Sequence, residues 1–130
     1  MQDVYFAALQ QQLKIKGNGQ PQLLLDLNRL DANIVALRHV MPAQLKPRLV
    51  VKSLANLKLI DHIISRLNTT ALMVFHLPHL KALLSNYPQA DILLGKPMPQ
   101  QAFQQYLAEG AEGIAQIQWL MDSMPRLEQY

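Results

Sequence analysis

The sequence contains no cysteine, and its basic residues form no run of five or more. The absence of cysteine excludes disulfide bonds and thiolate metal sites, and it is typical of proteins from a reducing compartment. Twelve Lys and Arg residues stand scattered against nine Asp and Glu residues. A surface that binds phosphate backbones needs clustered cations, so we expect no nucleic-acid partner.

Long hydrophobic runs are lacking as well. No stretch approaches the roughly 18–20 continuous apolar residues of a membrane span. The N-terminal segment MQDVYFAALQQQLKIKG has an acid at Asp3 and no apolar run, unlike a signal peptide. Half of the 130 residues are hydrophobic and 16% are charged, which is enough for one folded core. We therefore expect a soluble, cytoplasmic chain with no membrane partner.

Segments with helical periodicity alternate with short apolar segments along the whole chain. Leu30, Ile34 and Leu37, for example, fall on one helix face. Asn56 and Ser123 stand where a side chain is needed to cap a helix start. The expected helices cover residues 3–16, 28–41, 56–68, 78–87 and 99–109, with another beginning after residue 123. The expected strands cover residues 22–27, 48–51, 71–76, 91–95 and 114–122.

This alternation predicts an α/β fold. The expected strands are apolar throughout, which indicates burial on both faces of a parallel sheet with helices outside. The sheet is either an open doubly wound sheet or a piece of a barrel, and in both the working groups lie at the carboxyl ends of the strands. The polar residues at the expected strand exits are Asp26, Lys52, His76, Lys96 and Asp122.

Lys52 differs from the other polar residues in this set because no turn residue separates it from the apolar segment 48–51. Its stem is therefore expected to pack in the sheet. Partial burial of a lysine disfavours the charged form, and a neutral amine attacks aldehydes. Lys52 is thus a candidate Schiff-base residue; the alternative is a lysine that packs its stem and keeps its ammonium in water.

Two segments, PQLLLDLNRLDANI at 21–34 and KPRLVVKSLAN at 46–56, resemble the opening of the fold-type III pyridoxal-phosphate enzymes. This is the alanine racemase N-terminal-domain superfamily, in particular its D-threonine aldolase and D-serine dehydratase-like branch. That branch opens with proline, an apolar strand ending in Asp-Leu, a helix of the form L-x-x-N-I, and then Arg-Pro-x-x-Lys. ADILLGKPMP and IQWLMDS further on are similar too. The matching residues are Pro21, Asp26, Leu27, Leu30, Asn33, Ile34 and Lys52.

The sequence departs from the family pattern around the lysine. The order Pro47-Arg48 is reversed, and Val50 stands where the family often has histidine. Ser53 and Leu54 replace a Thr-His pair. The surroundings of the lysine and of a bound cofactor ring are therefore expected to differ from those in the family.

The resemblance implies a (β/α)8 TIM barrel in which Lys52 holds pyridoxal phosphate as a Schiff base. It implies an aldolase, dehydratase or racemase that acts on D-amino acids. A complete barrel needs about 250 residues, so residues 21–130 correspond to its N-terminal half and residues 1–20 to a helix and linker. Phosphate loops and the ligands of a divalent metal lie later in such enzymes. An unpaired sheet edge predicts a homo-oligomer, and a half-barrel alone is expected to be inactive.

His76 follows the strand beside that of Lys52 and is the second candidate cofactor-binding residue; the alternative is a hydrogen-bonded loop histidine. The other histidines, His39, His62 and His79, are expected at the surface, and no i, i+4 pair indicates a metal site. Lys96 is interpreted as a solvated loop lysine rather than an anion ligand. Two other function classes stay open: a non-catalytic pyridoxal-phosphate-binding protein, and an α/β interaction module that uses no cofactor.

Overall fold

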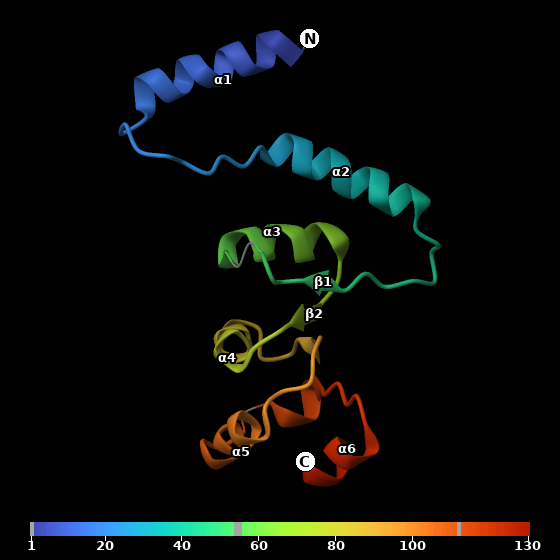
Figure 1. Cartoon of the computed structure of the whole chain (residues 1–130). Coiled ribbons are helices and arrows are strands. Elements are labelled where there is room, and N and C mark those ends of the chain that lie inside the picture. Colours follow the sequence, from blue (N-terminus) through green and yellow to red (C-terminus); the bar gives the residue numbers. More distant parts are fainter. Residues whose placement is uncertain (1, 54–55, 112) are drawn as a thin grey trace. The chain divides into compact units, whose positions relative to one another are not determined.

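The computed structural model describes residues 2–53, 56–111 and 113–130 (Figure 1). The chain divides after Leu30 into two compact units, ten residues beyond the boundary expected from the sequence. The helices are α1 (Gln2–Lys16), α2 (Leu27–Val40), α3 (Leu57–Leu67), α4 (Leu77–Asn86), α5 (Gln100–Ala108) and α6 (Met124–Gln129). The strands are β1 (Leu49–Val50), β2 (Ala71–Val74), β3 (Asp91–Leu94) and β4 (Ile117–Gln118), and a 3₁₀ turn, η1 (Ile114–Gln116), precedes β4.

The first unit is organised around Asp26. The hydroxyl of Tyr5 donates to Asp26 Oδ2 at 2.8 Å, and the backbone N–H of Arg29 donates to Oδ1 at 3.0 Å. These two hydrogen bonds, with the Arg29 N–H as the larger cause, hold the pKa of Asp26 below its usual value. The bond to Asp26 likewise raises the pKa of Tyr5. Asp26 therefore satisfies a free amide in the first turn of α2.

The expected strand at 22–27 is wrong. Residues 21–26 form neither helix nor strand, and α2 begins at Leu27. Leu23 is 83% exposed, and Leu24 and Leu25 are also exposed. An apolar run becomes a strand only where a neighbouring strand accepts its backbone hydrogen bonds, and the described residues place no strand beside this one. Asp26, expected to end a strand, starts a helix instead.

The second unit is a four-stranded sheet in which all strands are parallel and follow one another in the order β1-β2-β3-β4. Val50 pairs with Met73, Met73 with Leu93, and Leu93 with Gln118, which forms one row across all four strands. Helices α3, α4 and α5 alternate with these strands. The predicted α/β class, with a parallel sheet and alternating helices, is confirmed.

Only one face of this sheet is covered. Leu72, Val74, Ile92 and Leu94 are buried, and they share one core with apolar residues of α3, α4 and α5. These helices lie along one side of the strands in Figure 1. The alternate residues are only partly buried, and Val50 is 51% exposed. The expectation that both faces are buried is therefore wrong: the described residues cover one face and leave the face of Val50 open. This second surface is called the open face below.

The helix starts expected from the sequence are confirmed in part. The side chain of Asn56 accepts a hydrogen bond from the N–H of Leu59 at 3.1 Å and so caps α3. Ser123 occupies the corresponding position of α6, but its side chain caps nothing; its hydroxyl donates to Asp122 Oδ1. The expected strand 114–122 shortens to β4, because residues 114–116 turn in a 3₁₀ helix.

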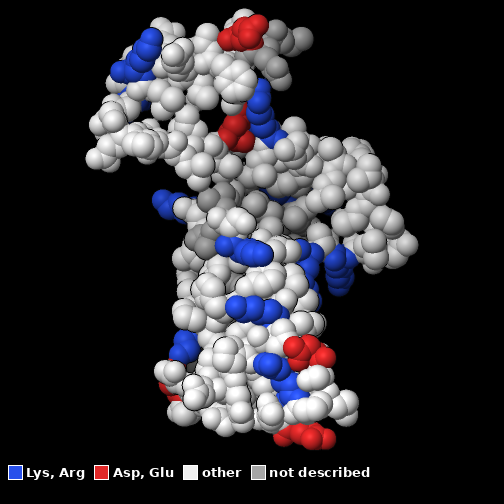
Figure 2. Space-filling model, in the orientation of Figure 1, with Lys and Arg blue, Asp and Glu red and all other residues white. Residues whose placement is uncertain are grey.

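No described charged side chain is fully buried. On the face of the molecule that Figure 2 shows, the Lys and Arg side chains lie as separate groups. Arg48 is a charged residue that several hydrogen bonds hold in the second unit. Its guanidinium donates to the carbonyl oxygens of Leu72 and Asp91 at 3.0 and 2.9 Å and to Asp91 Oδ2 at 2.7 Å. Gln118 Nε2 donates to the other oxygen of the same carboxylate at 2.7 Å. Side-chain hydrogen bonds therefore join all four strands at their amino ends.

We expect Arg48→Met to lower the free energy of unfolding of the second unit by about 1.5–3 kcal/mol, the range for hydrogen bonds that involve a charged group. The side chain is only 24% exposed, so water replaces the lost bonds poorly. Urea unfolding followed by the fluorescence of Trp119, the single tryptophan, measures the change. Lys46→Met, an exposed neighbour, is the matched control and should change stability by less than about 0.5 kcal/mol. Equal stability of the two variants would contradict this role of Arg48.

Candidate functional site

The carboxyl ends of the first three strands bring a lysine, an aromatic ring and a glycine into one row. The sheet hydrogen bonds continue past the strands, since Val51 N–H donates to the Met73 carbonyl at 2.9 Å and Gly95 N–H to the Val74 carbonyl at 2.8 Å. Residues two positions beyond a paired row lie on the same face. The row Val50–Met73–Leu93 lies on the open face. Two residues further along each strand, the same face therefore carries Lys52, Phe75 and Gly95.

Lys52 lies two residues after the end of β1, and its side chain is exposed. The expectation that its stem packs in the sheet is wrong, because Lys52 belongs to the open face and Val51, beside it, belongs to the core. Its Nζ lies 4.9 Å from the centre of the Phe75 ring. That distance is within the roughly 6 Å over which a cation is attracted to an aromatic face.

His76 occupies the start of α4. Its Nδ1 accepts a hydrogen bond from the backbone N–H of His79 at 3.2 Å, so the imidazole acts as the cap of the helix. This bond requires an unprotonated Nδ1. The geometry agrees with the alternative interpretation of His76, a hydrogen-bonded histidine. A contact between His76 and a cofactor stays a prediction.

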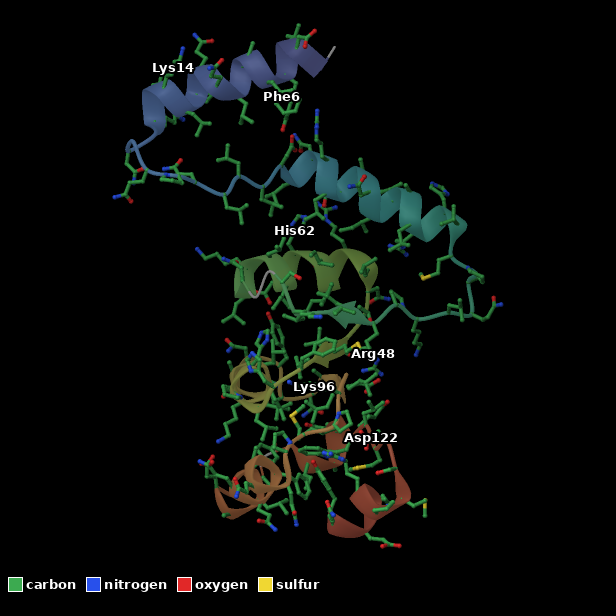
Figure 3. The ribbon with its side chains drawn as sticks, in the orientation of Figure 1. Phe6, Lys14, Arg48, His62, Lys96 and Asp122 are labelled. Carbon is green, nitrogen blue, oxygen red and sulfur yellow. The ribbon has the colours of Figure 1, made fainter. Side chains whose placement is uncertain are left out.

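The other polar residues at strand exits are not brought together around Lys52 by any contact that the structure shows. Lys96 is exposed in the loop after β3 (Figure 3). Asp122 pairs with Arg126 of α6 at 3.1 Å. Asp26 belongs to the first unit, where it caps α2. Of the residues expected from the sequence, Lys52 alone stands on the open face with a ring beside its amine.

His62 was expected to be solvated, and this expectation is wrong. Its Nε2 lies 2.6 Å from Asp31 Oδ1, and the ring is only 24% exposed. Arg66 binds the second oxygen of the same carboxylate at 3.0 Å. His62 therefore links α3 to Asp31, whereas His39 is exposed, as expected.

An open hollow of about 1190 Å³ lies at the opposite edge of the sheet. Lys46, Thr69, Thr70 and the Arg48–Asp91 pair are among the residues that line it. Because these residues precede β1, β2 and β3 or stand at their first positions, the hollow belongs to the amino ends of the strands. It is therefore separate from the row that contains Lys52.

Comparison of the sequence with models of protein families, with curated proteins and with solved structures finds no match. The structure also brings no three His, Asp or Glu side chains of the described residues into an arrangement that would hold a metal ion. Within residues 2–53, 56–111 and 113–130, no helix combines the length and apolarity that a bilayer crossing requires. The geometry of the site therefore carries the functional argument.

We expect acid to weaken the second unit through His79. Burial, and to a smaller extent the charge of nearby His76, holds the pKa of His79 below its usual value. The stability that comes from neutral His79 is fully present above the unfolded pKa of about 6.5, and it is lost as the pH falls through the lower folded pKa. The urea midpoint should therefore fall between about pH 7.5 and about pH 5. The urea midpoint of His79→Gln should fall less over this range. The midpoint of His39→Gln, a control at an exposed site, should fall as much as that of the parent. Identical pH profiles for the parent and His79→Gln would rule out this contribution.

Proposed function

We propose that the second unit is the N-terminal half of a fold-type III (β/α)8 barrel, and that Lys52 holds pyridoxal phosphate as a Schiff base. The observation that carries the proposal is the place of the Lys52 amine. It stands at the carboxyl end of the first strand of a parallel sheet, on the face that the helices leave open. In (β/α)8 barrels this face lines the interior, and active sites lie at the carboxyl ends of the strands.

The order of the strands supports a barrel over an open doubly wound sheet. A doubly wound sheet reverses its strand order at a switch point and carries helices on both faces. Here the order β1-β2-β3-β4 has no reversal, and α3, α4 and α5 contribute to one core on one face. Sequential order with helices on one side is the arrangement of a barrel wall.

The residues present suit the aldehyde group of the cofactor. A Schiff base needs a primary amine that an aldehyde can reach, and the Lys52 side chain is exposed. The half-buried ring of Phe75 offers an apolar surface next to it. Pyridoxal phosphate, when bound, supplies an electron sink for bonds at the Cα of an amino acid. In the proposed function, Lys52 released from the cofactor would add or remove a proton at that Cα.

The proposed activity is that of a D-amino-acid aldolase, dehydratase or racemase. Its support is the resemblance of the segments 21–34 and 46–56 together with the place of Lys52 at a strand end. A divalent metal belongs to this proposal only as a part of a complete enzyme. A panel of D-amino acids, applied to a longer chain that contains the complete barrel, distinguishes the three reactions by the disappearance of each acid and by its products.

We expect the protein, treated with pyridoxal phosphate and then with borohydride, to carry the reduced cofactor on Lys52. Peptide mapping by mass spectrometry locates the label, and the visible absorbance of the Schiff base reports it before reduction. Lys52→Ala should remove both signals. Lys96→Ala, which removes a lysine from the neighbouring loop, is the matched control and should keep both. An equal spectrum for Lys52→Ala and the parent would refute the assignment.

We also expect the protein to associate. Within the described residues β1 is paired only with β2 and β4 only with β3, so both outer strands keep an unpaired edge. Such edges bind other strands unless something covers them. Light scattering after gel filtration should give a mass above the 14.7 kDa of one chain. A single species of 14.7 kDa that turns over D-amino acids would contradict both the association and the half-barrel.

A further inference from the structure

One position in the row at the carboxyl ends of β1, β2 and β3 has no side chain. Gly95 lies on the open face beside the side chains of Met73 and Phe75. A Cβ added at Gly95 would lie 2.6 Å from Met73 Cε and 2.6 Å from Phe75 Cε1. Side-chain atoms do not approach so closely, so any other residue here would force these two side chains to move.

Gly95 leaves space for the neighbouring side chains, and its backbone conformation does not need a glycine. Its φ angle lies outside the left-handed region, in contrast to those of Gly110 and Gly113. An alanine could therefore adopt the same backbone angles. The nearest atoms that an added carbon would meet belong to the side chains of Met73 and Phe75, and the Phe75 ring occupies part of the volume that a side chain at Gly95 would take.

The ring in that space faces the amine of Lys52, with Nζ 4.9 Å from its centre. A lysine side chain is long and flexible, and an exposed one loses rotamer freedom when it is held in one place. Attraction between the ammonium and the ring face offsets part of that loss. The phenylalanine ring turns about only two side-chain torsions, and here it is half-buried. The ring is the more rigid of the two partners.

We propose that Phe75 is a positioning residue for Lys52, and that Gly95 makes its position possible. The ring lies in the volume that Gly95 leaves free and holds the Lys52 side chain on the open face. The functional part of this proposal rests on the Schiff base proposed for Lys52. The contact itself does not, so the two are tested by separate measurements.

The first measurement detects the contact without a cofactor. The lysines are converted to ¹³C-dimethyllysines, which stay cationic, and the Lys52 resonance is assigned by its loss in Lys52→Arg. A ring next to the amine shifts this resonance. Phe75→Leu should remove the shift, Phe75→Tyr should keep it, and Gly95→Ala should reduce it because the ring is displaced. Urea unfolding identifies any variant that does not fold, and Phe75→Met replaces Phe75→Leu if that variant fails.

The second measurement tests positioning in the proposed function. The fraction of Lys52 that carries pyridoxal phosphate after borohydride reduction is compared at a subsaturating cofactor concentration. A protonated Schiff-base nitrogen would remain a cation over the ring, so Phe75→Leu should lower this fraction about two- to fivefold, the range of an exposed cation–π contact. Phe75→Tyr should restore it. Labelling of Lys58 on α3 is the internal reference and should not change.

The outcomes separate the two proposals. A Lys52 resonance in Phe75→Leu identical to that of the parent overturns the positioning role of Phe75. Loss of the shift with an unchanged labelled fraction supports the contact and overturns its functional part, the positioning of Lys52 for the cofactor. If the parent protein forms no Schiff base at Lys52, the proposed function fails, and the resonance of Lys52 still decides whether Phe75 and Gly95 hold the side chain.

Discussion

The second unit depends on one charged contact, the hydrogen bonds between Arg48 and Asp91. Strands β1 and β4 have two residues each, so the backbone ladder alone fixes their alignment weakly. Arg48 also binds a carbonyl of β2, and Gln118 of β4 binds the Asp91 carboxylate. A slip of one residue would break these bonds and would move every side chain of the strand to the other face. The alignment at the amino ends therefore decides which residues meet at the carboxyl ends.

The sheet is asymmetric because its two faces have different partners. The core face packs against α3, α4 and α5, whereas the open face keeps apolar residues that are only partly buried. Aromatic rings continue the packing on the core face toward the C-terminus. The centre of the Phe103 ring lies 4.7 Å from that of Trp119 and 4.4 Å from that of Tyr130. The six-residue α6 is too short to be stable alone, and the Tyr130 ring at its end packs against Phe103 of α5.

The helices and the alternation of elements could be predicted from the sequence because both depend on local pattern. Asn56 as a cap is an example, since its partner is three residues away. The strand expected at 22–27 failed because an apolar run does not reveal whether another strand lies beside it. Burial on both faces failed for a similar reason: Met73 and Leu93 are as apolar as Leu72 and Ile92, and only the packed structure separates them.

The candidate site could be predicted only at Lys52. Phe75 and Gly95 were missed because their relation to Lys52 passes through strand pairing, which joins residues far apart in the chain. Once the row Val50–Met73–Leu93 is known, counting two residues onward finds both. The Lys52 stem does not pack in the sheet as expected, because the helices cover only the other face of the strands.

The space at Gly95 also has a consequence for how this sequence can change over evolutionary time. A larger residue at position 95 requires Met73 and Phe75 to move or to become smaller, since one atom of each would lie 2.6 Å from the added carbon. The three positions come from two different strands and their exits, so no local pattern links them. In related sequences they are expected to covary, and relatives with a bulky residue at 95 are expected to differ at Met73 or Phe75 or in the place of the ring beside Lys52.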